Sequence, residues 1–304
     1  MASSESRLVV LLALTANSLI AVLKFIAAAI SGSSAMLAEA FHSVADSGNQ
    51  LFLLRGSAAS RFRPSVRFPF GRGQEAYFWA FLVAVFLFVG GGVVAFMQGL
   101  DKIRHPGHEE GGFVFNLIVL GIAATFEISI AFIPALREFN RRRGSRSLVR
   151  SIREAKDPTL LVVLFEDSVA VLGILTAATG LVLAEITENA LWDGVASIVI
   201  GVLLAVTAWI LAIETKGLLL GESATRRDRS SIRAAALSIP EVETVQRLLT
   251  MHLGPEEILV NLDLGVEAGL SGTQMEDVIE RVEAEVVRLV PAATRVFIEV
   301  HLPE

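Results

Sequence analysis

The chain of 304 residues contains no cysteine. This absence excludes disulfide bonds, thiolate metal sites and cysteine-based redox switches, so a bound metal ion has to be held by histidine, carboxylate or amide groups. The net charge of -6 argues against a nucleic-acid partner, because such partners are usually met by a basic surface. Outside the apolar segments there is also no catalytic nucleophile, phosphate-binding loop or acid–base pair. We therefore expect neither an enzyme nor a prosthetic group.

Apolar residues dominate the first two thirds of the chain. Hydrophobic residues make up 53% of the sequence and the mean hydropathy is +0.60, although the last third has an ordinary charged composition. This contrast predicts a membrane domain, residues 1–220, followed by a soluble domain, residues 221–304. A helix crosses a bilayer with about 20 apolar residues. Six stretches reach that length, at about 7–31, 35–55, 76–100, 113–136, 158–184 and 191–213. We therefore expect a multi-pass protein with six transmembrane helices in a lipid bilayer.

Positive charge is concentrated in alternate loops. Residues 55–72 contain five arginines, and residues 137–156 contain seven arginines and one lysine. The loops of the other set carry little positive charge, and the loop between the fifth and sixth stretches carries only acids, Asp193 among them. By the positive-inside rule, both arginine-rich loops, the N-terminus and the C-terminal domain are cytoplasmic. We expect the cell (inner) membrane as the location.

Polar side chains interrupt the second apolar stretch at helical spacing. Glu39, His42, Asp46 and Asn49 with Gln50 fall on one stripe of a helix, and His42 and Asp46 are neighbours with about 6 Å between their Cβ atoms. An imidazole and a carboxylate so placed can share one cation. A soluble amphipathic helix would show the same pattern. The apolar spans on both sides favour a function or a buried partner instead, because an acid at the bilayer centre costs roughly 2.5–3.5 kcal/mol.

Other polar groups lie singly or in pairs within the apolar stretches. Asn17 is either an interhelical hydrogen-bond partner or a ligand. Lys24 is expected to extend its ammonium group to the membrane surface. Glu127, near mid-membrane, would pair with another helix, relay protons or reach a metal site. Glu166 and Asp167 are adjacent acids in the fifth stretch.

The C-terminal third predicts a small α+β domain. Ser223 or Thr225 caps a helix that ends near residue 236, and Ser271 opens a second helix that ends near residue 289. The pattern predicts strands at 241–251, 256–267 and 294–302. Within this domain His252 and His301 are the only histidines, and we expect both to be structural rather than ligands of a regulatory metal.

The second apolar stretch resembles the second-helix signature of a known family, the cation diffusion facilitators, which are divalent-metal/proton antiporters. The residues that match in order and spacing are Ser33, Ala35, Met36, Leu37, Ala38, Ala40, Phe41, His42 and Asp46. The match departs at Glu39 and Asn49. Residues 164–173 are similar to the branch that contains zinc transporter nine. The αββαβ order of the last third resembles the small metallochaperone-like cytoplasmic domain of the family.

In this family the fifth helix supplies two ligands four residues apart. Aligning Asp167 with the second ligand puts Val163, which cannot bind metal, at the first position, and the adjacent Glu166 is then the compensating group. Depth supports pairing the second and fifth helices. Asp46 lies about 16 Å from the outer end of its helix and Asp167 about 14 Å from the inner end of its own, so both reach the middle of a core about 30 Å thick.

The resemblance implies a homodimeric exporter of a divalent cation that takes up protons in exchange. Zinc is favoured because imidazole with carboxylate suits it, while Mn²⁺, Fe²⁺, Co²⁺ and Ni²⁺ accept similar ligands. A non-transporting membrane adaptor that kept the fold is the alternative, raised by Val163. The expected metal ligands are His42, Asp46 and Asp167, then Glu166, with Asn17 and Glu127 as more remote candidates.

Overall fold

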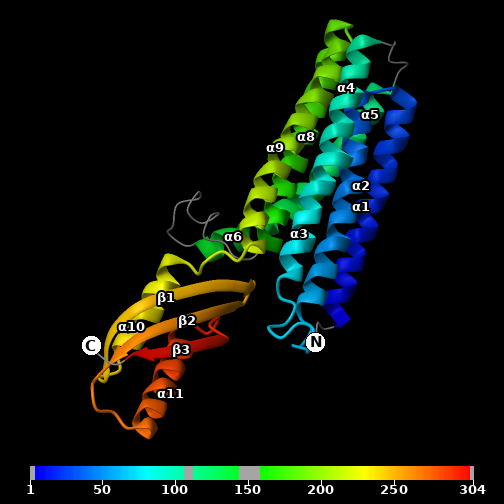
Figure 1. Ribbon diagram of the computed structural model, residues 1–304. Coiled ribbons are helices and arrows are strands. Elements are labelled where there is room, and N and C mark those ends of the chain that lie inside the picture. The colour runs from blue at the N-terminus through cyan, green and yellow to red at the C-terminus, as the bar shows by residue number, and fades with distance from the viewer. Residues whose placement is uncertain (1–3, 106–111, 144–157, 302–304) are drawn as a thin grey trace. The chain divides into compact units, whose positions relative to one another are not determined.

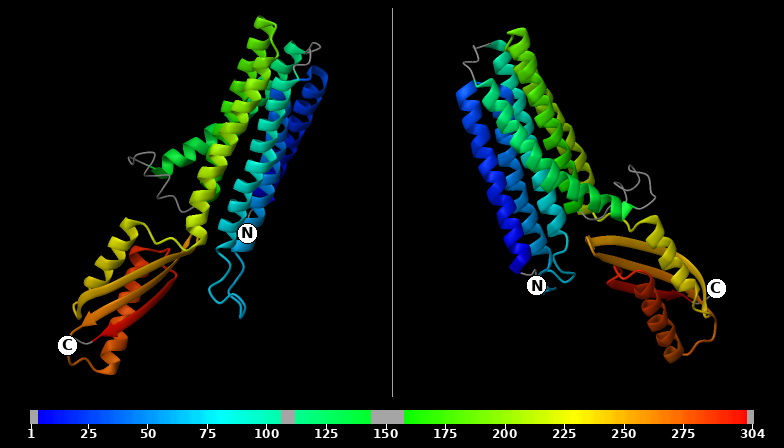
Figure 2. Two further views of the ribbon diagram at one scale, coloured as in Figure 1. Left: turned by 45° about the horizontal axis from the view of Figure 1, so that its top comes forward. Right: turned by 180° about the vertical axis from the view of Figure 1, so that it is seen from behind.

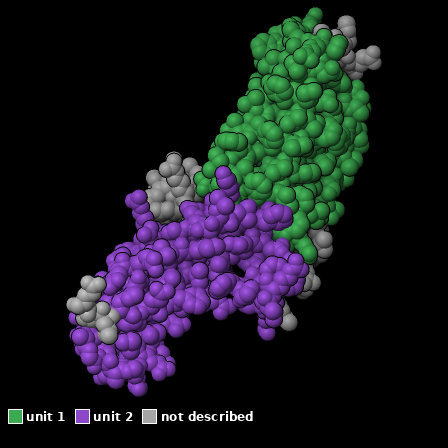
Figure 3. Space-filling model, in the orientation of Figure 1, with its two compact units in different colours: residues 1–56, 79–215 green, residues 57–78, 216–304 purple. Residues whose placement is uncertain are grey.

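The computed structural model describes residues 4–105, 112–143 and 158–301. The chain forms two compact units (Figure 3). Unit 1 consists of residues 1–56 and 79–215, and unit 2 consists of residues 57–78 and 216–304. The predicted boundary at residue 220 stays a prediction. Residues 57–78, which comprise the end of α2, the connection 61–74 and the start of α3, belong to unit 2 although they lie early in the sequence.

Unit 1 is a bundle of long helices that run beside one another (Figures 1 and 2). Two of its helices are built from α-helical segments joined by a π-helical segment, namely α3–η1–α4 and α5–η2–α6. The segments are α1 Ser4–Ser31, α2 Ser34–Ser60, α3 Glu75–Phe86, η1 Leu87–Val93, α4 Val94–Arg104, α5 Phe113–Phe126, η2 Glu127–Phe132, α6 Ile133–Arg143, α8 Pro158–Thr187 and α9 Leu191–Leu219. The core holds many alanines and the outer faces carry large apolar side chains, as expected of helices that face lipid.

The membrane-spanning count of six is not fully confirmed. Within the described residues, four helices are both long and apolar enough to cross a bilayer: Glu75–Arg104, Phe113–Arg141, Leu161–Thr187 and Leu191–Leu219. Residues 17–31 of α1 form a shorter apolar helix. Helix α2 has 27 residues, and its polar stripe accounts for its absence from this group.

Glycines allow α9 to approach the α3–η1–α4 helix closely. A Cβ atom added to Gly92 would lie 3.2 Å from the backbone nitrogen of Ala205, and one added to Gly201 would lie 2.7 Å from the backbone nitrogen of Phe96. Backbones therefore touch where a side chain would not fit. The three consecutive glycines at 90–92 lie in η1, and one of them, Gly92, makes this close contact with α9.

Unit 2 contains a three-stranded sheet with two helices, in the predicted order αββαβ. The elements are α10 Arg226–Leu237, β1 Val242–Gly254, β2 Glu257–Val266, α11 Gly272–Leu289 and β3 Arg295–His301 (Figure 1). Strand β2 is central, antiparallel to β1 and parallel to β3. Thr225 caps α10 and Ser271 caps α11 through a capping box with Gln274, as expected from the sequence. The small α+β domain is confirmed.

Candidate metal site

The start of α2 is held by an acid from another helix. Gly32 turns the chain after α1 with φ +67°, a conformation that favours glycine. The fully buried carboxylate of Asp193, in the first turn of α9, then accepts hydrogen bonds from the hydroxyl of Ser33 at 2.5 Å, from the backbone N–H of Ser34 at 2.6 Å and from that of Ala35 at 3.2 Å. A carboxylate at this position pairs the free N–H groups of a helix start and complements the helix dipole.

Helix α2 carries His42 and Asp46 on adjacent turns, with both side chains buried. His42 Nδ1 lies 3.5 Å from Asp46 Oδ1, which is too long for a strong hydrogen bond. Both ring nitrogens of His42 and Oδ1 of Asp46 are buried and make no hydrogen bond to the described residues. Buried polar atoms are usually paired, so these lone pairs point to a missing partner such as a cation.

Helix α8 supplies two further carboxylates. The amide Nδ2 of Asn49 donates to Oε1 of Glu166 at 2.5 Å, which joins α2 to α8 directly. Asp167 is half-buried, and its Oδ2 is buried without a hydrogen bond to the described residues. The structure thus joins α2 to α8 through Asn49 and Glu166. Among the described residues, however, no three ligand atoms of His42, Asp46, Glu166 and Asp167 lie within 4.8 Å of one another, so the structure does not assemble these side chains into a closed metal shell.

The two remaining candidates differ. Glu127, the first residue of η2, is buried. Among the described residues it does not form a group of metal-ligating atoms with the other candidates. Asn17 lies on α1 at intermediate exposure and makes no hydrogen bond to the other candidates in the described part of the chain.

Lys24 does not reach the membrane surface, and that expectation is wrong. Its side chain is buried, and Nζ donates to Oε2 of Glu39 at 2.9 Å and to Oγ of Ser43 at 2.9 Å. The carboxylate of Glu39 on the facing helix balances the charge of the ammonium group, so the group is stable inside the bundle. The sequence contains both residues but does not indicate that they meet.

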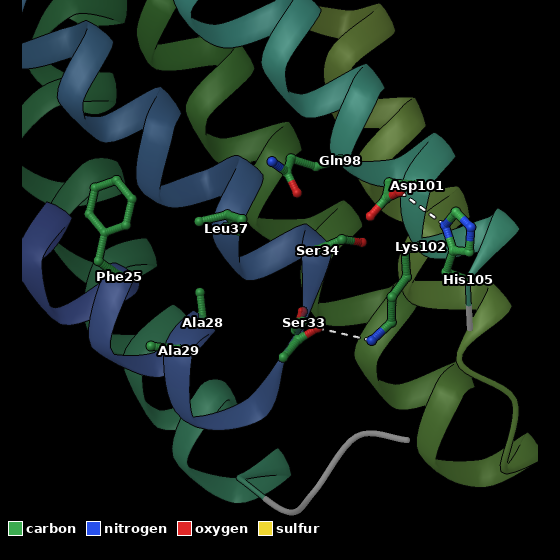
Figure 4. A pocket seen from close by; sticks show the side chains of 11 residues that line it. Phe25, Ala28, Ala29, Ser33, Ser34, Leu37, Gln98, Asp101, Lys102 and His105 are labelled. Atoms are coloured by element: carbon green, nitrogen blue, oxygen red, sulfur yellow. Dashed lines mark hydrogen bonds and ion pairs between the residues drawn. The ribbon is translucent and has the colours of Figure 1, made fainter. Parts of the chain in front are cut away.

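At the turn between α1 and α2 lies a separate cavity of about 290 Å³, lined by both apolar and polar side chains (Figure 4). Lys102 Nζ donates to the carbonyl oxygen of Gly32 at 2.9 Å, and His105 Nδ1 lies 3.1 Å from Oδ1 of Asp101. Asp101 and His105 are exposed, and none of the six candidate ligands lines this cavity. Residues 106–111, which follow His105, lie outside the described residues.

Unit 2 contains a cluster that the sequence did not suggest. His301 Nε2 lies 2.8 Å from Oδ1 of Asp263, and Asp263, Glu299 and His301 together could hold a metal ion. They lie on β2 and β3, so only strand pairing brings them together. Arg247 lies 3.8 Å from Asp263 and 4.0 Å from Glu299, and its positive charge competes with a cation there. His252 is buried in β1.

Comparisons with known proteins cover nearly the whole chain. Residues 10–220 match the family model described as the cation efflux transmembrane domain, and residues 224–301 match the model of the cation efflux protein, cytoplasmic domain. The proton-coupled zinc antiporter SLC30A9, mitochondrial, of Mus musculus is 30% identical over 81% of this chain, which spans only 43% of that relative. Metal tolerance protein C4 of Arabidopsis thaliana is 27% identical over 98% of this chain and 74% of its own length.

Two further similarities are more distant. Zinc transporter ZitB of Escherichia coli is 25% identical over 76% of this chain and 68% of its own length. Among solved structures, a nickel form of the MamM CTD is 22% identical and covers 26% of this chain and 100% of that chain, with a TM-score of 0.25.

Proposed function

Since the chain belongs to the cation diffusion facilitator family, in the branch similar to zinc transporter nine, we propose that it exports a divalent metal ion from the cytoplasm in exchange for protons. Zinc is the proposed substrate. The names of the relatives from mouse and Escherichia coli support zinc, and the mouse relative's name supports proton coupling. The observation that carries the proposal is the buried pair His42 and Asp46, whose lone pairs lack hydrogen-bond partners in the described residues.

The proposed site consists of His42 and Asp46 on α2 and Asp167 on α8. A neutral imidazole with two carboxylates cancels a charge of 2+, which reduces the cost of holding the ion away from water. Three protein ligands leave a coordination position open for water or Glu166, and an open position suits exchange better than a closed structural site. Mn²⁺, Fe²⁺, Co²⁺ and Ni²⁺ remain alternative substrates, because these ligands also suit them.

Proton exchange follows from the chemistry of these ligands. A metal ion binds only their deprotonated forms, so protons and metal compete for the site and binding releases protons. In the outward-facing state, an acidic exterior would protonate a ligand and favour release of the metal. Glu166 and Glu127 are buried acids of the helix bundle and are proposed to pass protons or complete the metal shell.

The proposed arrangement in the membrane follows from charge. We assign the arginine-rich loops, both termini and the domain 221–304 to the cytoplasmic side of the cell membrane, with residues 1–220 as the transport domain. The match of residues 224–301 to the family's cytoplasmic domain supports this side for the C-terminal part and supports a homodimer formed through it.

Flux measurements test the proposal. The purified full chain in liposomes should move zinc, and Asp46→Ala and Asp167→Ala should each abolish flux because each removes a charge that neutralises the cation. Asp101→Ala is the matched control, because Asp101 is an exposed acid on α4 and should leave flux unchanged. Zinc flux at the wild-type rate from either site variant would refute the site. An absence of flux for every metal in wild type would favour the non-transporting adaptor.

A further inference from the structure

A buried ion pair lies beside the proposed metal site. Lys24 of α1 and Glu39 of α2 have exposed fractions of 1% and 0%, and Nζ of Lys24 lies 2.9 Å from Oε2 of Glu39. Ser43 accepts a second hydrogen bond from the same ammonium group. Two charges in this position are costly to remove from water, and breaking such a pair leaves an uncompensated charge.

The fold makes room for the carboxylate of Glu39. Gly173 of α8 faces this group, and a Cβ atom added there would overlap Oε1 of Glu39. That oxygen is buried and makes no hydrogen bond to the described residues, so only one side of the carboxylate is used by Lys24. Glu39 thus retains an oxygen able to bind a cation.

Glu39 also lies close to one of the proposed ligands, His42. It precedes His42 by three residues on α2, a spacing that places the two side chains on the same face with Cβ atoms about 5–6 Å apart. Ser43, the second acceptor of the Lys24 ammonium group, directly follows His42 on α2. The ammonium group is therefore anchored both to Glu39 and to the residue next to a proposed ligand.

We propose that Lys24 is a specificity-determining residue, whose ammonium group withholds Glu39 from the transported cation. This inference rests on the proposed function. While Lys24 pairs with Glu39, the cation is held by the imidazole of His42 and by the carboxylates of Asp46 and Asp167. This ligand set suits zinc. With Glu39 released, an additional carboxylate becomes available, and oxygen-rich sites suit Mn²⁺ better.

The test is competition binding of Zn²⁺ and Mn²⁺ to the purified full chain in detergent. Lys24→Met keeps the apolar stem and removes the charge. We expect it to lower the preference for zinc over manganese by about tenfold, which corresponds to ~1.4 kcal/mol. The double variant Lys24→Met/Glu39→Gln removes the released charge as well and should return the ratio to that of wild type. If Lys24→Met does not fold, Lys24→Gln replaces it in the test. Lys24→Gln keeps an amide donor for Glu39 but removes the charge, and it should shift the zinc-to-manganese ratio in the same direction.

Three results would overturn the inference. The first is an unchanged zinc-to-manganese ratio in a folded Lys24 variant. The second is a double variant that keeps the shifted ratio, because the effect would then not act through Glu39. The third is a lower unfolding temperature in all variants without a change in the ratio, which a purely structural pair would give. Wild-type protein that binds neither metal would instead refute the proposed function itself.

Discussion

Replacing Asp193 should loosen the start of the helix that carries the proposed site. Asp193→Ala removes the acceptor for the backbone N–H groups of Ser34 and Ala35 and for the hydroxyl of Ser33, all in a buried region. Loss of a helix cap costs about 0.5–2 kcal/mol. Loss of a negative charge at a partly buried helix start costs up to ~2 kcal/mol more. We expect about 3 kcal/mol of local stability to be lost, or ~100-fold in the opening equilibrium.

Hydrogen–deuterium exchange of the full chain in detergent measures this opening directly. Amides in the first turns of α2 should exchange ~100-fold faster in Asp193→Ala, and about tenfold faster in Asp193→Asn, which keeps one acceptor oxygen but loses the charge. Glu185→Ala is the control, because Glu185 is exposed at the end of α8 and should leave exchange at wild-type rates. Unchanged exchange in Asp193→Ala would refute the role of this carboxylate in holding α2.

Three other predictions concern the site and unit 2. Val163→His should tighten zinc binding by about tenfold if residue 163 faces the metal, since one added ligand contributes ~1.4 kcal/mol; unchanged affinity by calorimetry would mean that it does not. The fragment 221–304 should dimerise without zinc, and loss of the dimer on addition of a chelator would reveal a metal site there. Zinc export from liposomes should accelerate as the receiving side is acidified, because protons displace metal from its ligands. A flat profile in wild type would contradict proton exchange, and comparison of His42→Asn with Glu166→Gln would identify which group couples protons to metal.

Local sequence patterns were sufficient for unit 2 and for placing His42 and Asp46 on adjacent turns of one helix. Caps, strand alternation and turn residues act between near neighbours, so α10, α11 and the three strands could be placed within a few residues. The four-residue spacing of His42 and Asp46 likewise lies within one helix and needs no tertiary information.

Contacts between distant segments could not be predicted in this way. The sequence indicated only that Asp193 is an acid in an outer loop. In the structure it caps a helix that starts 159 residues earlier in the chain. Lys24 was expected at the membrane surface. Its partner Glu39 lies on another helix, so the sequence around Lys24 gives no sign of the buried ion pair. Asp263 and His301 meet only through strand pairing. In each case a polar group is satisfied by a partner that no local periodicity identifies.

The π-helical segment η2 changes which side of its helix meets the neighbouring helix. A π-turn takes up about one residue more than an α-turn, and one residue corresponds to about 100° of rotation around the axis. Ala135 and Phe139, which follow η2, are buried in a cluster with Leu161 and Leu164 of α8. An uninterrupted α-helix from residue 113 would carry both side chains around the axis and away from that cluster. The extra residue therefore lets a single helix present one face to its neighbours before Glu127 and a different face after it.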